Sequence, residues 1–140
     1  MRLVPLLLTL LPVCLPPLLA AQDAPPPVPP RPPEVTDSAV ARGHDLFHGS
    51  ANCAACHGLE GVGTDSGAPL AQGIWMHGSD SYQGIVSRIV HGIPKKVSTR
   101  DTAMPMRGWI TLTDAEVRDV AAYVWVISHQ WTTPAKPRSP

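Results

Sequence analysis

Hydrophobic residues recur at helical spacing in three parts of the chain, each preceded by polar residues suited to begin a helix. The clearest part lies near the C-terminus, where Thr113 and Glu116 form a T-x-x-E capping box. The apolar face that follows consists of Val117, Val120, Ala121, Val124 and Ile127. These spacings of three and four place the side chains on one side of a helix, so the pattern predicts a helix here.

Two further helices are predicted upstream. One begins near Thr36, with Asp37 in its first turn, and another follows Ser79 or Asp80. The periodic positions of the first are Val40, Gly43 and Phe47. Those of the second are Ile85, Val86, Ile89 and Val90. Both patterns have the period of a helix and not the alternation of a strand.

Long glycine-rich loops separate these helices. They span residues 58–67, 73–78 and 92–108. We therefore expect one small all-α domain at residues 36–131. A domain of this size buries only a modest core by itself, and loops this long usually carry function or wrap a ligand. A large, flat, apolar cofactor would complete such a core.

The N-terminal segment is expected to direct export. Residues 1–21 combine a basic Arg2, an apolar run and two small residues at the end, which is the layout of a secretory signal peptide. Four prolines in this segment disfavour a membrane-spanning helix, so cleavage is favoured over an uncleaved membrane anchor. A lipoprotein anchored through Cys14 is the weaker alternative, because Pro12 and Val13 stand where small residues are expected. Each alternative predicts a periplasmic protein.

Two other terminal segments are expected to lie outside the packed domain. Residues 22–35 include the run PPPVPPRPP, which predicts an extended and semi-rigid linker. Residues 132–140 are expected to form a disordered tail. Over the whole chain 11 basic side chains balance 11 acidic ones, so no global charge favours nucleic acid as the partner.

The chemistry of the chain centres on the sequence Cys53-Ala54-Ala55-Cys56-His57. C-x-x-C-H is the attachment signature of c-type haem. Two thiols at this spacing can each bond one vinyl group of a haem, and the adjacent histidine can then place a ring nitrogen on the iron. Because haem attachment takes place outside the cytoplasm, the motif agrees with the export signal. We expect one covalent haem c per chain.

Three other uses of this cysteine pair are possible. It could form a disulfide beside an idle histidine, or half of a zinc site, although no second C-x-x-C or H-x-x-x-H completes four ligands. It could also be a thioredoxin-like redox pair, but no βαβ pattern surrounds it.

A haem that transfers electrons needs a second axial ligand. The candidate side chains are Met76, Met104, Met106, His44, His48, His77, His91 and His129. Met104 is favoured because it precedes Pro105, which stiffens the loop ahead of the last helix. A neutral methionine sulfur also favours the reduced iron. Met106 is the main rival and His91 the next.

The chain resembles the class I cytochrome c family over nearly all of residues 36–131. The segments that carry the resemblance are Gly43 with Phe47, CAACHG at 53–58, Gly61, Gly63, Ala68-Pro69-Leu70, Met104-Pro105, Leu112-Thr113-Asp114 and the stretch 121–124. A more distant resemblance, at residues 73–78 and in the stretch from Met104-Pro105 to Tyr123-Val124, is to the cytochrome modules of terminal oxidases and membrane-bound dehydrogenases. The second methionine, Met106, departs from the family pattern.

The resemblance implies a fold and several residue roles. The fold is a small all-α cytochrome c fold, with three to five helices and long loops wrapped around the haem. The first helix crosses the last, so that Gly43 and Phe47 meet Tyr123. The backbone carbonyl of Pro69 accepts the proton on the second ring nitrogen of His57 and orients that ligand.

The predicted function is electron transfer without bond chemistry, by a shuttle whose partners are a dehydrogenase, an oxidase or another cytochrome. The alternative is a cytochrome subunit of a larger membrane-associated dehydrogenase or terminal oxidase. A third hypothesis is an enzyme or sensor with an open iron position, and a fourth is a binding domain without haem.

A cluster of cations bears on the partner. Its members are Arg88, Lys95, Lys96, Arg100 and Arg107, with only Asp101 against them. They predict either a docking ring for an acidic partner or an ordinary solvated face. One or two of them, or the Trp109 indole, are alternative hydrogen-bond donors to a haem propionate. Trp125 and Trp131 are expected to pack, and His44, His48 and His129 to lie at the surface.

Overall fold

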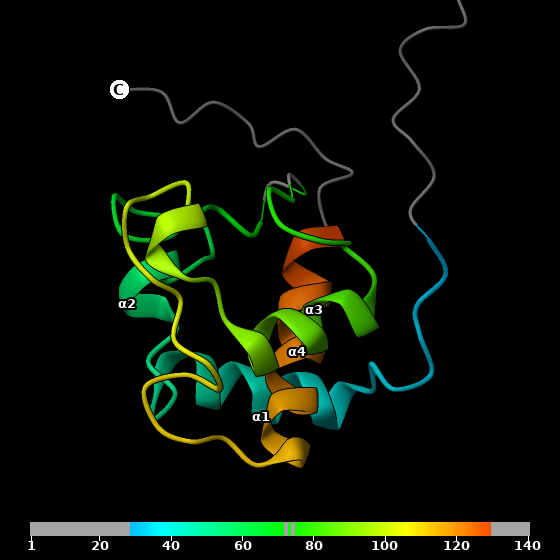
Figure 1. Cartoon of the computed structure of the whole chain (residues 1–140). Coiled ribbons are helices and arrows are strands. Elements are labelled where there is room, and N and C mark those ends of the chain that lie inside the picture. The colour runs from blue at the N-terminus through cyan, green and yellow to red at the C-terminus, as the bar shows by residue number, and fades with distance from the viewer. Residues whose placement is uncertain (1–28, 72, 74, 130–140) are drawn as a thin grey trace, which may run out of the picture.

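A computed structural model describes residues 29–71, 73 and 75–129 (Figure 1). In chain order its elements are α1 (Asp37–His48), α2 (Ala54–His57), α3 (Tyr82–His91), the short 3-10 helix η1 (Lys95–Val97) and α4 (Asp114–His129). These described residues form no strand beyond an isolated bridge between Ile93 and Met104. The prediction of an all-α fold with long loops is therefore confirmed.

The three longer helices begin where a side chain accepts a backbone N–H. The Thr36 hydroxyl accepts from Ala39 (3.2 Å) at the start of α1. At α4 the capping box is complete, because Thr113 N–H donates to the Glu116 carboxylate (2.8 Å) and Glu116 N–H donates to the Thr113 hydroxyl (3.3 Å). Helix α3 begins slightly later than predicted, since its cap is Ser81.

Helices α1 and α4 cross at close range, and Gly43 makes this approach possible. A Cβ atom at Gly43 would overlap the backbone carbonyl of Asp119 on α4. One turn further along α1, the ring of Phe47 meets that of Tyr123 edge-on, with 5.2 Å between centroids. At the crossing's exposed rim, Arg42 Nε donates to Asp119 (2.7 Å). The predicted meeting of Gly43 and Phe47 with Tyr123 is thus observed.

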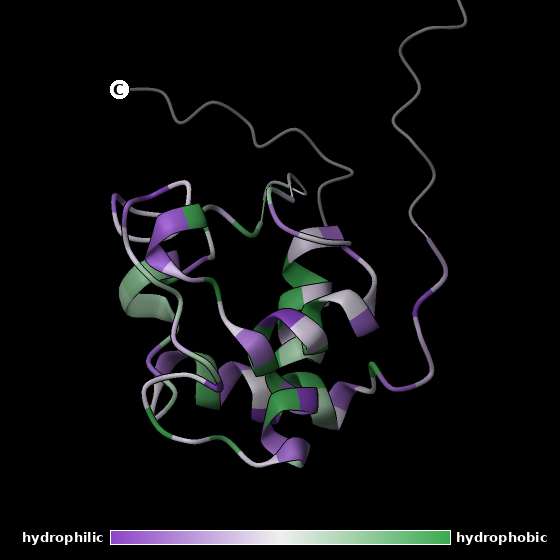
Figure 2. Ribbon diagram, viewed as in Figure 1, coloured by the Kyte–Doolittle hydropathy of each residue, from purple (hydrophilic) through white to green (hydrophobic). Residues whose placement is uncertain are grey.

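The core lies between α1, α3 and α4, and Figure 2 shows hydrophobic residues gathered along α4 where the other two helices meet it. Helix α3 is held at its start by the Tyr82 hydroxyl, which donates to the Arg118 carbonyl of α4 (3.3 Å). The largest fully buried side chains are Phe47, Ile85, Leu112, Val117 and Val120. Trp125 is also buried, as predicted. Helix α2 and the loops enclose a separate space on one side of this core.

Several predictions fall outside the described residues. These are the signal segment at 1–21, most of the linker at 22–35, Trp131 and the tail at 132–140. The described end of the linker is fastened to the domain, because Val35 is buried and Arg31 pairs with Asp37 (2.8 Å). Among the described helices, none has the length and apolar character needed to cross a membrane.

Replacing Gly43 tests the helix crossing. We expect Gly43→Ala to lower the free energy of unfolding by about 1–3 kcal/mol, because the new methyl group must push α4 away. The matched control is Ala41→Gln on the exposed face of α1, which should change stability by less than about 0.5 kcal/mol. Thermal unfolding followed by circular dichroism measures both. Equal stability of Gly43→Ala and the wild type would contradict the close crossing.

Candidate functional site

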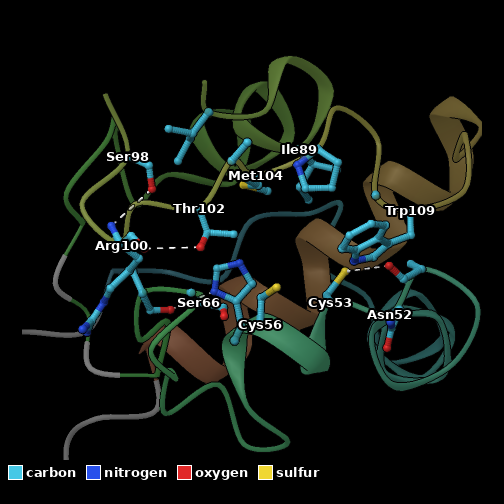
Figure 3. A pocket seen from close by; sticks show the side chains of 18 of the residues that line it. Asn52, Cys53, Cys56, Ser66, Ile89, Ser98, Arg100, Thr102, Met104 and Trp109 are labelled. Atoms are coloured by element: carbon cyan, nitrogen blue, oxygen red, sulfur yellow. Dashed lines mark hydrogen bonds between the residues drawn. The ribbon is translucent and has the colours of Figure 1, made fainter. Parts of the chain in front are cut away.

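The cysteine motif folds as a single turn of helix. Cys53 precedes α2, and the turn is closed by hydrogen bonds from His57 N–H to the Cys53 carbonyl (2.9 Å) and from Gly58 N–H to the Ala54 carbonyl (2.8 Å). Residues three positions apart lie on one face of a helix. Figure 3 accordingly shows the sulfur atoms of Cys53 and Cys56 directed into one pocket. Both thiols are free.

The surroundings of Cys53 disfavour its thiolate form. Burial raises the pKa of Cys53 to about 11, so this thiol is protonated at neutral pH. The thiolate is the form that binds zinc and attacks disulfides. In the described part of the chain, moreover, no three His, Cys, Asp or Glu side chains are grouped to hold a metal ion.

His57 is oriented by a backbone carbonyl. Its Nδ1 lies 2.8 Å from the Ala68 oxygen, and only a protonated Nδ1 can donate to this acceptor. Burial lowers the pKa of His57, although the same hydrogen bond opposes the shift. The ring is therefore neutral at pH 7, with Nε2 unprotonated and able to bind a metal.

The acceptor differs from the predicted one. The family resemblance implied the carbonyl of Pro69, but the structure gives that of Ala68. Ala68 precedes a proline, which restricts its backbone to extended conformations. A turn just before it is closed by Thr64 N–H donating to the Gly67 carbonyl (2.9 Å). This geometry directs the Ala68 carbonyl at the histidine, while Pro69 lines the adjoining cavity.

The loop with the two methionines is fixed to the end of α3. Ile93 N–H donates to the Met104 carbonyl (3.0 Å), and Met104 N–H donates to the Ile93 carbonyl (2.9 Å). Just beyond, Arg107 N–H donates to the Ile89 carbonyl (2.7 Å). Met104 is half-buried and lines the site, whereas Met106 is 70% exposed. The backbone therefore turns only one of the two sulfurs inward.

Between these two parts lies an open space in two connected regions. The space between atoms amounts to about 720 and 620 Å³ in the two regions, and part of it is open solvent. Both regions are lined by Cys53, His57, Ala68, His77, Ile93 and Met104. The rest of the walls is largely apolar. Ile89 and Leu112 line the larger region, and Phe47 and Ile85 line the smaller one. His57 and Met104 thus face one space from different segments.

A sequence model described as cytochrome c matches residues 40–128, which is well over half of the chain. The chain belongs to the cytochrome c family. Members of this family carry covalently attached haem and transfer electrons. The matched region includes every residue that lines the two regions of the space.

One curated relative of this cytochrome is the Cbb3-type cytochrome c oxidase subunit CcoP of Cereibacter sphaeroides, 40% identical over 87 residues. The match covers 60% of this chain but 26% of the relative, so the chain spans about a quarter of that subunit's length. No solved structure gave a significant match.

The residues of this cytochrome fit a haem at one further place. Three buried side-chain nitrogens lack any hydrogen-bond partner within the described protein: Trp75 Nε1, His77 Nε2 and Arg88 Nε. All three side chains line the smaller region of the space. An unpaired buried polar group costs about 1–3 kcal/mol, and the Trp75 and Arg88 nitrogens can only donate, so this group indicates a missing acceptor. A haem has two carboxylates, the propionates, that can supply it.

The sequence indicates only part of this group. Arg88 is one of the cations that it offers to a propionate, whereas it gives no signal for Trp75 and indicates His77 only as a candidate iron ligand. Both lie in an irregular glycine-rich segment, where no periodicity indicates which side chains point inward. Trp109 lines the larger region but is 66% exposed.

The other candidate iron ligands lie elsewhere. His44 and His91 are exposed, and Met76 is mostly exposed at the edge of the smaller region. His48 is half-buried, with its ring nitrogens 2.8 Å from the His44 carbonyl and 2.7 Å from that of Leu59. His129 stacks on Trp125 with 4.3 Å between ring centroids, and its side chain is largely buried. The expectation that His129 lies at the surface is therefore wrong, because the end of α4 packs against the segment containing Asp80.

Gly92 offers a test of how the methionine loop is held. It ends α3 with a positive φ of 61°, and a Cβ atom there would overlap the Met104 carbonyl. We expect Gly92→Ala to displace the loop and cost about 1–3 kcal/mol of stability. In the haem-loaded protein it should also alter the absorption spectrum of the haem. The control is Gly49→Ala at the end of α1, where a Cβ atom would be crowded by the Asp45 carbonyl and not by the methionine loop. Unchanged stability and an unchanged spectrum in Gly92→Ala would contradict this role.

Proposed function

We propose that this protein is a periplasmic electron carrier with one haem c, attached through Cys53 and Cys56 and ligated by His57 and Met104. The observation that carries the proposal is the common space faced by the two thiols, His57 and Met104, which come from two different segments of the chain. The proposed domain is residues 36–131, preceded by an export signal and a proline-rich linker.

Each residue has a defined task in this proposal. When bound, the haem supplies an iron that takes up and releases one electron. His57 offers Nε2 because its Nδ1 proton is engaged by Ala68. Met104 offers a neutral thioether, which favours the reduced iron and raises the potential relative to a second histidine. If His57 and Met104 both hold the iron, small molecules would have no ready access to it.

The remaining lining controls solvent and charge. Phe47, Ile85, Ile89 and Leu112 exclude water from most of the space. Low polarity around a redox centre is one of the means by which a protein sets its potential. Trp75, His77 and Arg88 provide hydrogen-bond donors for the propionates, so that these carboxylates need not be buried without partners.

A second candidate function is favoured by the comparison with CcoP. The relative is an oxidase subunit, and 60% of this chain matches part of it. On this alternative the same domain passes electrons within a stable membrane-associated oxidase or dehydrogenase complex. Stable copurification with such a complex from the native host supports the alternative, whereas a free monomer in sizing supports the shuttle.

Covalent attachment is tested by mass. We expect the wild type, made in a host with the haem-attachment machinery, to retain one haem per chain after denaturation. The Cys53→Ala, Cys56→Ala double variant should lose it, because no thioether can form. Cys14→Ala is the matched control and should keep the full haem content. A wild-type mass equal to that of the bare polypeptide would refute the proposal.

The sixth ligand is tested by three single variants. We expect Met104→Ala to abolish the sulfur-to-iron charge-transfer band of the oxidised protein and to lower the potential by on the order of 0.1 V, within the roughly 0.8 V that axial ligands span. Met106→Ala and His77→Ala should both retain the band. Loss of the band in Met106→Ala, with the band intact in Met104→Ala, would reassign the ligand.

A further inference from the structure

Each of the three longer helices ends on a histidine that bonds back to its own helix. These residues are His48 of α1, His91 of α3 and His129 of α4. In each case Nδ1 lies 2.8 Å from the carbonyl oxygen four residues earlier. A neutral imidazole can satisfy this carbonyl with its single N–H. The group that meets the other nitrogen therefore decides whether the ring needs a second proton.

At His48 the other nitrogen also meets a carbonyl. Its Nε2 lies 2.7 Å from the Leu59 oxygen. The described residues offer no hydrogen-bond partner to His91 Nε2, and His129 Nε2 faces the Asp80 carboxylate at 3.7 Å. Because carbonyl oxygens only accept, either neutral tautomer of His48 would turn a lone pair towards an oxygen at hydrogen-bond distance. Only the imidazolium, with a proton on each nitrogen, donates to both carbonyls.

The groups that face His48 suit a cation. On α1 the ring of His44 lies 4.3 Å away between centroids, and its own Nδ1 is 3.1 Å from the Asp45 carboxylate. The loop that meets Nε2 continues with Glu60, a second carboxylate. On α4 the ring of Tyr123 lies 5.7 Å away, and burial, followed by the charge of Glu60, raises the pKa of its phenol. Tyr123 is therefore uncharged at neutral pH.

The other charged groups at the crossing of α1 and α4 are already paired. Arg42 and Asp119 form an ion pair with each other (2.7 Å). The position of His48 at the end of α1 adds to the preference, because the C-terminus of a helix favours a positive charge. Both the charges and the helix end thus agree with the proton count that the two carbonyls require.

The carbonyl that His48 contacts belongs to the loop of residues 58–63, which supports the haem ligand. Gly63 N–H donates to the His57 carbonyl (2.7 Å), and Leu70 N–H donates to the Gly61 carbonyl (2.7 Å). The loop therefore connects His57 to the segment whose carbonyl orients its ring. A displacement of this loop would be passed to the ligand and to its acceptor together.

His48 fastens this loop to α1. The side chain of Leu59 is 69% exposed, so its burial does not hold the loop in place. The hydrogen bond from His48 Nε2 to the Leu59 backbone instead joins the loop to the end of α1, and the rings of Phe47 and Tyr123 border the imidazole at 5.2 and 5.7 Å.

We propose that His48 is a proton-dependent positioning residue of the haem site, whose imidazolium joins the end of α1 to the loop that supports His57. The proposal rests on the proposed function. Loss of one ring proton removes one hydrogen bond and sets a lone pair against a carbonyl, which frees the loop. The folded chain binds this proton more tightly than the unfolded chain, so the stability that it contributes is complete at low pH and is lost as the pH rises. The same loss of positive charge disfavours electron uptake, so the reduction potential falls.

Nitrogen NMR of the reduced, haem-loaded chain tests the protonation state. At a pH where half of the His91 rings have lost a proton, we expect His48 to keep protons on both nitrogens, bound about tenfold more tightly. His91 is the internal control, because it shares the helix-end position and the bond from Nδ1 but lacks the second carbonyl. Equal loss of protons from the two rings would overturn the proposal.

A variant without the donors tests the hold on the loop. His48→Phe keeps an aromatic ring at this position but removes both N–H groups. We expect hydrogen exchange of the Gly61 and Gly63 amides, corrected for the intrinsic effect of pH, to become about threefold to tenfold faster and to lose its remaining dependence on pH. The matched control His91→Phe should change neither amide. Unaltered exchange in His48→Phe would overturn the proposal.

The reduction potential gives a readout that a merely structural role would not move. We expect the potential of the wild type to fall as the pH rises through the range in which His48 loses its proton, and this part of the fall to be absent in His48→Phe and retained in His91→Phe. The same pH profile in His48→Phe and the wild type would overturn the proposal.

Two further points keep the outcomes separate. If His48→Phe does not fold, His48→Gln, which keeps a neutral donor but no charge, is compared with the wild type by the same two measurements. A chain that carries no haem contradicts the proposed function instead, because nitrogen NMR and hydrogen exchange report on His48 without using the iron.

Discussion

The close crossing of α1 and α4 is the constraint on which the rest of the structure depends. Gly43 lets the two backbones meet without an intervening side chain, and Phe47 and Tyr123 pack immediately beside this point. The end of α1 is thereby fixed, and α2 follows it after only a few residues, with Ala51 buried between them. The position of Cys53, Cys56 and His57 in space is thus a consequence of helix packing some ten residues away.

The site is built from a helical turn that carries the cysteines and from an irregular loop that carries Met104. The cysteine side is built on α2 and closed by the glycine-rich loop, in which the Thr64 hydroxyl donates to the Cys56 carbonyl (2.6 Å). The methionine side is an irregular loop, fixed to α3 by its backbone hydrogen bonds at Ile93 and Ile89. A ligand that bridges both sides would stabilise the domain, since it completes a core that the chain leaves open.

The distribution of polar groups agrees with this division of tasks. Buried side-chain nitrogens without a partner in the described protein lie at Trp75, His77 and Arg88, while Lys96 and Arg100 are exposed and form no ion pair with a described residue. The first group suits a carboxylate inside the protein, and the second group remains in contact with water. Burial makes the inner contacts costly to leave unmet, whereas the outer charges act over a distance and weaken with salt.

Local rules in the sequence determined the helices and the chemistry, because each is encoded within a few residues. The capping box at Thr113 and Glu116 fixes the start of α4, and C-x-x-C-H needs only a helical turn to bring its thiols together. Tertiary packing decided what those rules leave open. In the folded chain His57 contacts the Ala68 carbonyl and not that of Pro69. Met104 lies against the space while Met106 is exposed, and Trp75, His77 and Arg88 line the same region. These outcomes depend on contacts between separate loop segments, for which no local periodicity or spacing carries a signal.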